Sequence, residues 1–462
     1  MEHLVRTLQR HRALALRPPP DRAAAWSITA MSLTLLVGGV SPALGQTQPV
    51  DPVEQGATPM DKIDMSEPQP TQPVVPSAKP QEGSAFINDS KFGGELRSFY
   101  FNRGKYDDTH SEAWALGGFL SYQSGYLANL LRFGAVAYTS LPLYAPDDRD
   151  GTLLLKPGQE GYFVLGQIYG EIKLADGVFG AFGRKEYDTP YIAKHDVRMT
   201  PNTFEGATVY GKMGGKDGAP ELRFGGGYIS KIKEKNSDEF KWMSTVAGAG
   251  VDRGVFLGGA NYAQKEFSVG AIDYYSDDII NIFYTEAKYF LPLAPTTKLS
   301  FAGQYTDQRS TGNNLLTGSE FSTGAWALKS DLTLGATVLT LAYSSTRSGS
   351  NMFSPWSGYP GYTAVQVKDF NRANEKAVMV KGGYDFSALG AKGLSAYALY
   401  VNGSGVNAPL FNEREADFNV QYALQAGALR GTSFRMRYAH ITQKGGGDPT
   451  INDFRLIVNY DF

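Results

Sequence analysis

Residues Ile451–Phe462, at the end of the chain, read INDFRLIVNYDF and decide the fold class. In an extended chain, one side of this stretch carries Phe454, Leu456, Val458, Tyr460 and Phe462. The other side carries Asp453, Arg455, Ile457, Asn459 and Asp461. A two-residue period of this kind is typical of a strand with one face against an apolar medium and the other against water.

The same alternation recurs from Lys91 to the end of the chain, in segments of about ten residues separated by Gly, Asp, Asn and Pro. In residues 162–174 it sets Gln167, Tyr169, Glu171 and Lys173 against Val164, Ile168 and Ile172. A soluble β-sandwich also alternates, but a soluble all-β chain of this length would normally split into domains. A closed barrel with a wet interior explains both the charged faces and the length.

The chain ends on Phe462, and this ending resembles the C-terminal signal of bacterial outer-membrane β-barrels. The mean hydropathy is −0.28, and after residue 45 no apolar run is long enough for a spanning helix. The absence of Cys excludes disulfides, thiolate catalysis and zinc–thiolate sites, and the five His leave few chances for an imidazole metal cluster. We therefore expect no metal and no cofactor.

Residues 1–45 have the features of a secretory signal peptide. Several arginines precede an apolar run from Ala23 to Val40, and the small-residue stretch Ala43-Leu44-Gly45 follows it. A permanent helical anchor is the alternative, since the run approaches spanning length. Residues 46–85 are rich in Pro and Gln and lack apolar periodicity, so we expect a disordered periplasmic segment before a barrel over residues 86–462.

We count roughly nineteen strand-like segments, but both ends of a bacterial barrel lie in the periplasm, so the number must be even. Residues 239–249 alternate poorly, and we assign them to an external loop. The prediction is an all-β fold: a membrane-spanning antiparallel β-barrel of about eighteen strands that encloses an aqueous channel. Short turns such as Ala175-Asp176-Gly177 and Ser276-Asp277-Asp278 are expected in the periplasm. The long extracellular loops are expected at 142–161, 188–202, 234–253, 309–320 and 348–375.

Four stretches resemble the OprD family of specific porins: Leu96–Arg103 (LRSFYFNR), Arg198–Gly206 (RMTPNTFEG), Phe370–Gly403 (FNRANEKAVMVKGGYDFSALGAKGLSAYALYVNG) and Asn452–Tyr460 (NDFRLIVNY). The resemblance implies an eighteen-stranded channel with a constricting third loop and a ladder of basic residues in the lumen. Members of that family typically pass small carboxylate-bearing molecules, including basic amino acids. Asn402 stands where members often carry Arg, and Glu286 and Lys288 lie where an Arg would be less surprising, so the substrate does not carry over.

Alternation assigns a set of basic side chains to the lumen: Arg97, Arg132, Arg223, Lys381, Arg435, Arg437 and Arg455. A planar guanidinium can donate two hydrogen bonds to a carboxylate. Arg435 and Arg437 share a strand face at a spacing of ~7 Å, so a carboxylate could pass from one to the other. Packing within the wall is the competing interpretation, because acidic partners are available at Glu95, Glu171, Glu286, Asp331, Glu415 and Asp417.

Residues 188–202 form the candidate constriction loop, which contains Tyr191, Lys194, His195, Asp196 and Arg198. A loop that folds inward narrows a channel and focuses its electric field. His195 and Asp196 do not predict a catalytic dyad, because adjacent side chains in an extended loop rarely point at each other. Trp356, Tyr359 and Tyr362, in the loop 348–375, are expected in an outer vestibule or in the headgroup belt.

The sequence therefore predicts a passive outer-membrane channel that prefers small carboxylate-bearing solutes such as amino acids or organic acids. A general, non-selective diffusion porin is the first alternative. An outer-membrane barrel hydrolase is a weaker one, since no nucleophile or acid–base cluster is visible in the sequence. The expected partners are outer-membrane lipid and lipopolysaccharide, the barrel-assembly machinery during folding and the solutes, with no nucleic acid. We expect a monomer or a weak trimer.

Overall fold

The computed structural model describes residues 85–462, which begin with a short helix, α1 (Ala85–Asn88). The predicted signal peptide at 1–45 and the predicted segment at 46–85 lie outside the described residues, except for Ala85. No helix in the described part is long and apolar enough to cross a membrane.

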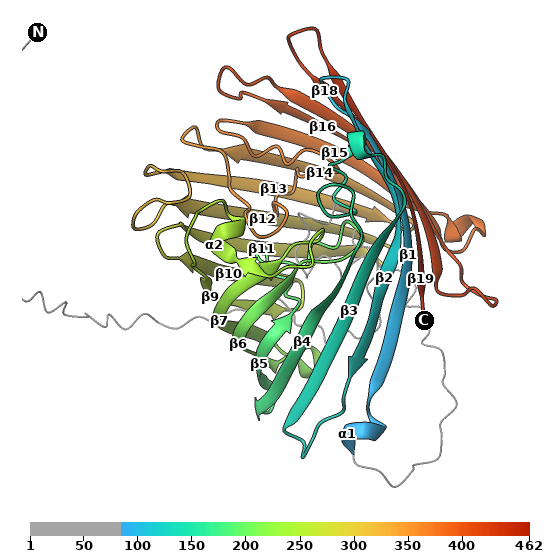
Figure 1. The fold of residues 1–462 in the computed structure, drawn as a ribbon. Helices are drawn as coiled ribbons and strands as arrows, with labels where there is room; N and C mark the ends of the chain where they lie inside the picture. Colours follow the sequence, from blue (N-terminus) through green and yellow to red (C-terminus); the bar gives the residue numbers. More distant parts are fainter. Residues whose placement is uncertain (1–84) are drawn as a thin grey trace, which may run out of the picture. The chain divides into compact units, whose positions relative to one another are not determined.

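Within residues 85–462, one antiparallel sheet of nineteen strands makes up the fold, and eighteen of them close into a ring (Figure 1). The first strands are β1 (Lys91–Gly104), β2 (His110–Gln123), β3 (Leu131–Tyr144), β4 (Tyr162–Ala175), β5 (Val178–Lys185), β6 (Thr203–Gly214), β7 (Glu221–Lys233), β8 (Lys241–Trp242) and β9 (Val255–Gln264). The remaining strands are β10 (Phe267–Ser276), β11 (Ile280–Ala294), β12 (Thr297–Arg309), β13 (Ser322–Leu334), β14 (Thr337–Thr346), β15 (Lys376–Asp385), β16 (Leu394–Ser404), β17 (Glu413–Ala423), β18 (Thr432–Gln443) and β19 (Thr450–Asp461). The short helices between them are η3 (Asp147–Arg149), η4 (Lys216–Gly218), α2 (Met243–Val246) and η5 (Phe386–Leu389).

The ring closes because β1 pairs with β19, in a register that runs from Glu95 opposite Asp461 to Gly104 opposite Asn452. β8 pairs only with β7, and the ring passes directly from β7 to β9. The prediction of an eighteen-strand barrel is therefore confirmed. The assignment of residues 239–249 to a loop is confirmed as well, since β8 and α2 lie within the connection between β7 and β9.

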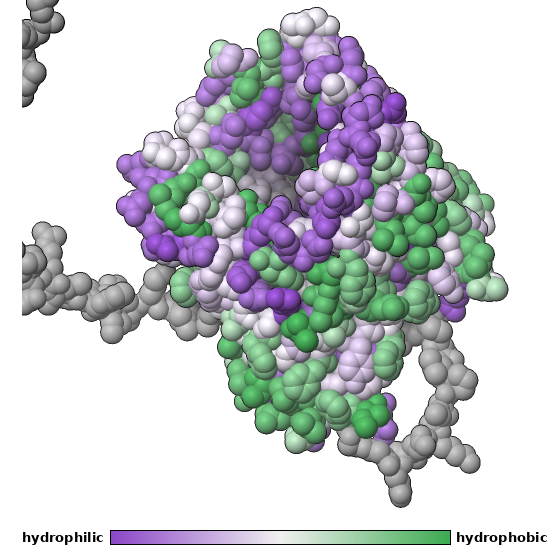
Figure 2. All heavy atoms as spheres, viewed as in Figure 1, coloured by the Kyte–Doolittle hydropathy of each residue, from purple (hydrophilic) through white to green (hydrophobic). Residues whose placement is uncertain are grey.

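Side chains alternate between the inside and the outside of the barrel. In β19, Arg455 is 1% exposed while its neighbour Leu456 is 43% exposed, and the pattern continues along the strand. Figure 2 shows hydrophobic residues over much of the outer wall and hydrophilic residues around a hollow near the loops. An apolar outside and a polar inside are the arrangement of a membrane barrel.

The alternation predicted for residues 162–174 is wrong at Val164. Val164 is 8% exposed and faces inward, whereas Phe163 is 69% exposed and faces outward. The cause is a β-bulge, because Val136 pairs with Gln167 while the next residue, Ala137, pairs with Leu165. One extra residue in a strand reverses the facing of every side chain beyond it.

The long connections lie at one end of the barrel, and Phe462 lies at the other, where its backbone N–H and C=O bond to Gly94. The turn Ser276-Asp277-Asp278 was expected among the periplasmic turns, and this expectation is wrong. Leu315 in the long loop after β12 donates its N–H to Asp278 O over 2.8 Å, so the turn shares the long-loop end.

Candidate pore and its inward loops

The connection between β5 and β6, here called the first inward loop (residues 186–202), crosses the interior of the barrel. On one wall, Arg97 of β1 donates to both carboxylate oxygens of Asp196, over 2.7 and 3.0 Å. On the other wall, the Tyr191 N–H donates to the Tyr274 hydroxyl over 3.2 Å, and the Tyr191 hydroxyl donates to Thr306 over 3.3 Å. Since β1 lies across the ring from β10–β12, the loop reaches from wall to wall.

The connection between β14 and β15, the second inward loop (residues 347–375), also enters the barrel. The Tyr362 hydroxyl donates to Glu286 of β11 over 2.5 Å. The backbone N–H groups of Val367 and Lys368 donate to Glu415 of β17 over 2.7 and 2.8 Å. Carboxylates of the wall therefore hold the backbone of the loop in place.

The expectation that Trp356, Tyr359 and Tyr362 lie in an outer vestibule or in the headgroup belt is wrong. They are 1%, 3% and 4% exposed, and Trp356 donates its indole N–H to Met243 O over 2.8 Å. Trp356 and Tyr359 belong to one apolar cluster with Tyr191 of the first inward loop. Their rings are buried because the loop folds into the barrel, away from both water and lipid.

Four of the predicted basic residues lie on adjacent strands: Arg435 and Arg437 on β18, Arg455 on β19 and Arg97 on β1. Arg437 and Arg455 are direct cross-strand partners. Arg435 donates to Asn419 over 2.7 Å, and Arg455 donates to Asp453 over 2.7 Å. This stretch of the inner wall is therefore rich in guanidinium groups.

A single carboxylate binds Arg455 and a further arginine of the inner wall, Arg103. Asp453 accepts from Arg455 over 2.7 Å and from Arg103 over 2.6 Å. The guanidinium carbons of Arg103, Arg198 and Arg455 lie 5.2, 5.1 and 5.0 Å from the centre of the Phe101 ring. Cations within about 6 Å of an aromatic ring are attracted to it, so Phe101 helps to hold three positive charges together.

The other three predicted basic residues lie on separate strands. Arg132 of β3 is 2.6 Å from Glu171, and Arg223 of β7 is 2.5 Å from Glu221. Lys381 of β15 lies over the Tyr397 ring, with its Nζ 4.4 Å from the ring centre. The structure therefore does not bring all the predicted basic residues into one row.

Within the first inward loop, the predicted residues have different partners. His195 Nδ1 lies 3.2 Å from Lys235 Nζ, whereas Asp196 contacts Arg97, so the two adjacent side chains do not form a dyad. Arg198 donates from Nε to Thr152 O over 2.8 Å, which ties the loop to the connection after β3. Lys194 donates its backbone N–H to Tyr187 O over 2.7 Å, and Tyr191 is fully buried.

Titratable loop groups gather where the inward loops meet the connection after β7. Burial lowers the pKa of Lys235 to about 7, and the nearby charge of Arg198 acts in the same direction. Burial, together with Lys235 and Arg198, holds the pKa of His195 well below its usual value. Burial raises the pKa of Asp369, in the second inward loop, to about 6. The charge at this meeting point therefore depends on pH near neutrality.

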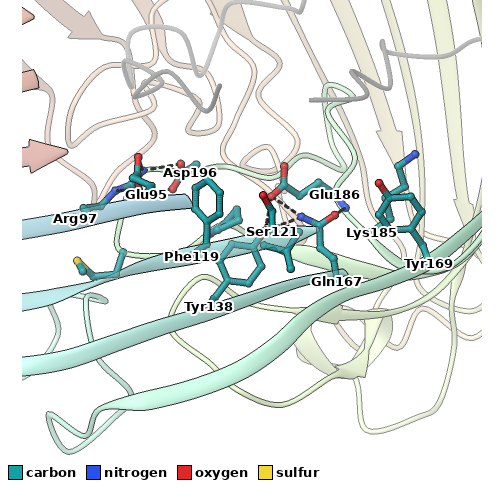
Figure 3. Close-up of a pocket in the computed structure, with 13 residues that line it drawn as sticks. Glu95, Arg97, Phe119, Ser121, Tyr138, Gln167, Tyr169, Lys185, Glu186 and Asp196 are labelled. Atoms are coloured by element: carbon teal, nitrogen blue, oxygen red, sulfur yellow. Dashed lines mark hydrogen bonds and ion pairs between the residues drawn. The ribbon is translucent and has the colours of Figure 1, made fainter. Parts of the chain in front are cut away.

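A hollow lies between the first inward loop and the wall from β1 to β5 (Figure 3). Glu95, Arg97 and Asp196 lie together at one end of it, and Lys185 and Tyr169 lie at the other. Between them, Glu186 accepts from the Tyr138 hydroxyl over 2.7 Å and from Gln167 over 3.0 Å. Both charge signs and several aromatic rings line this part of the lumen.

Sequence reasoning missed Lys185, Glu186 and the inward course of residues 347–375. The number of aromatic residues in the second inward loop could have indicated this course. A loop that stays in water seldom carries so many large aromatic side chains.

A closed barrel with an apolar outer band, long loops at one end and loops folded into a polar lumen defines an outer-membrane porin. The family model described as outer membrane porin, OprD family, matches residues 84–462. The chain belongs to this family, and its location is the bacterial outer membrane.

The chain is also similar to individual porins. The chain is 25% identical to Porin D of Pseudomonas aeruginosa over 417 residues, which cover 82% of this chain and 92% of that protein. It is 23% identical to the porin-like protein GalP of Pseudomonas putida over 391 residues, or 81% and 92% of the two chains. The crystal structure of OccK9 (OpdG) of Pseudomonas aeruginosa superposes with a TM-score of 0.72 at 25% identity, covering 82% of this chain and 99% of that one. The family is one of substrate-specific channels.

Proposed function

We propose that this porin passes small carboxylate-bearing solutes passively, and that basic side chains on β18, β19 and β1 attract them. The observation that carries the proposal is the sharing of Asp453 by Arg103 and Arg455, with Arg437 directly opposite Arg455. A second carboxylate, Asp417, also interacts with Arg437 and Arg455, so three arginines stand against two carboxylates and positive charge is in excess. Such an excess concentrates anions in a narrow channel, and a guanidinium can hold a carboxylate through two hydrogen bonds.

The carboxylates of β17 lie near these arginines, but they also bind the backbone of the second inward loop. Glu415 accepts two backbone N–H groups of the second inward loop, and Asp417 accepts the Gln366 N–H over 3.1 Å. These contacts give the acids a structural role in holding the loop. A solute that moves along the arginines would meet several weak sites in series, which permits both entry and release.

A general diffusion porin is the second candidate, and specific ion pairs favour it. Arg97, Arg132 and Arg223 each lie within ion-pair distance of a carboxylate, at 2.7, 2.6 and 2.5 Å. Paired charges of this kind support the wall and offer less attraction to a passing anion.

Uptake by vesicles separates the two candidates. Glucuronate and glucose have similar size and differ by one carboxylate. Purified protein in liposomes should admit glucuronate faster than glucose at equal concentration. Equal rates would favour the general porin. Hydrolysis of an added ester, such as a phospholipid or a p-nitrophenyl ester, by the purified protein would point instead to the barrel hydrolase.

We also propose that residues 1–45 are removed on export and that the following segment stays in the periplasm. The intact mass of protein extracted from the outer membrane tests the cleavage. A mass that includes residues 1–45 would support the helical anchor.

Sedimentation in detergent tests the proposed monomer or weak trimer, and depletion of the assembly machinery tests its role in folding.

A further inference from the structure

Alternation separates the charges at the long-loop ends of β15 and β17. Lys376 and Arg414 face outward and are exposed. Their sequence neighbours Glu375, Glu413 and Glu415 are buried. The acids hold the inward loop and the bases face the surroundings of the barrel, so this part of the outer rim carries positive charge alone.

The outward cations gather around two polar residues of β16. Arg414 is the direct cross-strand partner of Asn402, and Lys376 is the partner of Ser404. Lys444 Nζ lies 3.2 Å from the side-chain oxygen of Asn402. Neighbouring strands are about 4.8 Å apart and alternate residues about 7 Å apart, so the three cations form one compact group. We call Lys376, Arg414 and Lys444 the basic patch.

No ion pair involves the basic patch within residues 85–462. Elsewhere on the same rim, outward cations are neutralised locally. Arg309 and Arg347 share Asp307, at 2.5 and 3.1 Å. The basic patch and the neighbouring rim both face outward, but only the cations of the neighbouring rim have carboxylate partners.

The position of the basic patch along the barrel indicates its partner. Just toward the barrel middle, Val378, Tyr400 and Phe418 are exposed on the same strands and belong to the apolar outer band. A cation at the edge of that band lies at the depth of the headgroups, and anionic headgroups attract it. The patch lies at the long-loop end, away from Phe462, which places it at the outer leaflet.

We propose that the basic patch binds the phosphate groups of lipopolysaccharide in the outer leaflet. A phosphate monoester carries up to two negative charges and accepts several hydrogen bonds, which matches three cationic donors with an amide and a hydroxyl between them. The exposed Tyr400 and Phe418 below would lie against the acyl chains. A singly charged phospholipid headgroup offers less charge to the same donors.

Binding of defined lipids to detergent-purified protein tests the proposal, with native mass spectrometry as the readout. The probes are lipopolysaccharide, its dephosphorylated form, phosphatidylglycerol and inorganic phosphate. Replacing the patch (Lys376→Gln, Arg414→Gln and Lys444→Gln) should weaken lipopolysaccharide binding by roughly a hundredfold, at about fivefold per cation. The matched control, Arg309→Gln with Arg347→Gln, should bind as the parent does.

Both variants should keep the parent's folded fraction on unboiled gels and its single-channel conductance, because the patch lies outside the pore. Parent-level binding by the patch variant would overturn the proposal. Equal affinity of the parent for dephosphorylated lipopolysaccharide or phosphatidylglycerol would also overturn it, since either result removes the role of phosphate. Competition by inorganic phosphate at equal affinity would show that the lipid is not the ligand.

Discussion

Arg437 of β18 and Arg455 of β19 lie directly opposite each other on the inner wall. Like charges at this cross-strand position repel, which lowers the stability of the sheet. Arg455 is held in place by Asp453 and by the carbonyl oxygen of Gln366, at 2.7 and 3.2 Å. Under the function proposed above, a passing anion would relieve this repulsion.

The contact between Arg97 and Asp196 anchors the first inward loop. Asp196→Asn removes the charge that Arg97 binds through two hydrogen bonds, while Arg97 keeps Glu95 as a partner. A lost charge-assisted contact of about 1.5–3 kcal/mol should loosen this end of the loop. We expect higher and noisier single-channel conductance. The matched variant Glu95→Gln leaves the anchor intact and should conduct like the parent. Unchanged conductance of Asp196→Asn would mean that this contact does not fix the loop.

Trp356 packs the second inward loop against the connection that contains α2. Trp356→Ala should leave a cavity and remove the hydrogen bond to Met243 O, at a cost of about 3–5 kcal/mol to local packing. We expect protease cleavage within residues 347–375 that the parent resists. Trp326, which is exposed on the outer face, is the control, and Trp326→Ala should leave the loop resistant. Resistance of Trp356→Ala would contradict the anchoring role.

Ion selectivity should depend on pH through Lys235 and Asp369. Below about pH 6, Lys235 is charged and Asp369 is mostly neutral; above about pH 7, Asp369 is charged and Lys235 increasingly neutral. Burial and the charge of Lys235 hold the pKa of the third group, His195, well below its usual value. The meeting point therefore loses positive charge as pH rises. The channel should become more selective for cations, and the reversal potential in a salt gradient measures this change.

The charge of Arg198 also acts on Lys235, and the charge of Lys368 acts on Asp369. The double variant Lys235→Gln with Asp369→Asn should show a smaller pH dependence than the parent. His440→Gln, on the outer face, should retain the parent's dependence. A double variant that still shifts as the parent does would place the titrating groups elsewhere.

Gly94 and Phe462 meet at the closing seam. A Cβ atom at Gly94 would lie 2.6 Å from the Phe462 ring, so Gly94→Val should displace that ring and lower the fraction of folded barrel on unboiled gels. Deleting Phe462 should have the same effect. Gly382→Val is the matched control on the outer face, because the nearest atom there is 3.7 Å away. Equal folding of all three variants would show that the seam tolerates loss of this contact.

The barrel could be predicted from the sequence because the two-residue period is a local property of each strand. The same reasoning failed at Val164, since a bulge is set by the pairing with β3 and leaves no clear local mark. The inward course of residues 347–375 could not be predicted either. It depends on contacts between distant segments, such as Trp356 with Met243 and Val367 with Glu415. The sequence alternation correctly predicted that Arg435 and Arg437 face the inside of the barrel. Their role in solute passage stays a prediction.

The double variant Arg435→Gln with Arg437→Gln tests whether arginines on the wall select carboxylates. It keeps an unbranched polar side chain at both positions, although a shorter one, and removes two positive charges from β18. In a wet lumen, the loss of each charge should weaken carboxylate binding to the wall by roughly 0.5–1 kcal/mol. For the pair, this corresponds to a binding constant about five- to thirtyfold lower. Arg309→Gln, on the outer rim, is the control for charge removal alone. The measurement is the ratio of glucuronate to glucose uptake in reconstituted vesicles. We predict that the ratio falls toward one in the double variant while glucose uptake stays at the parent value. A double variant that keeps the parent ratio would contradict carboxylate selection by these arginines.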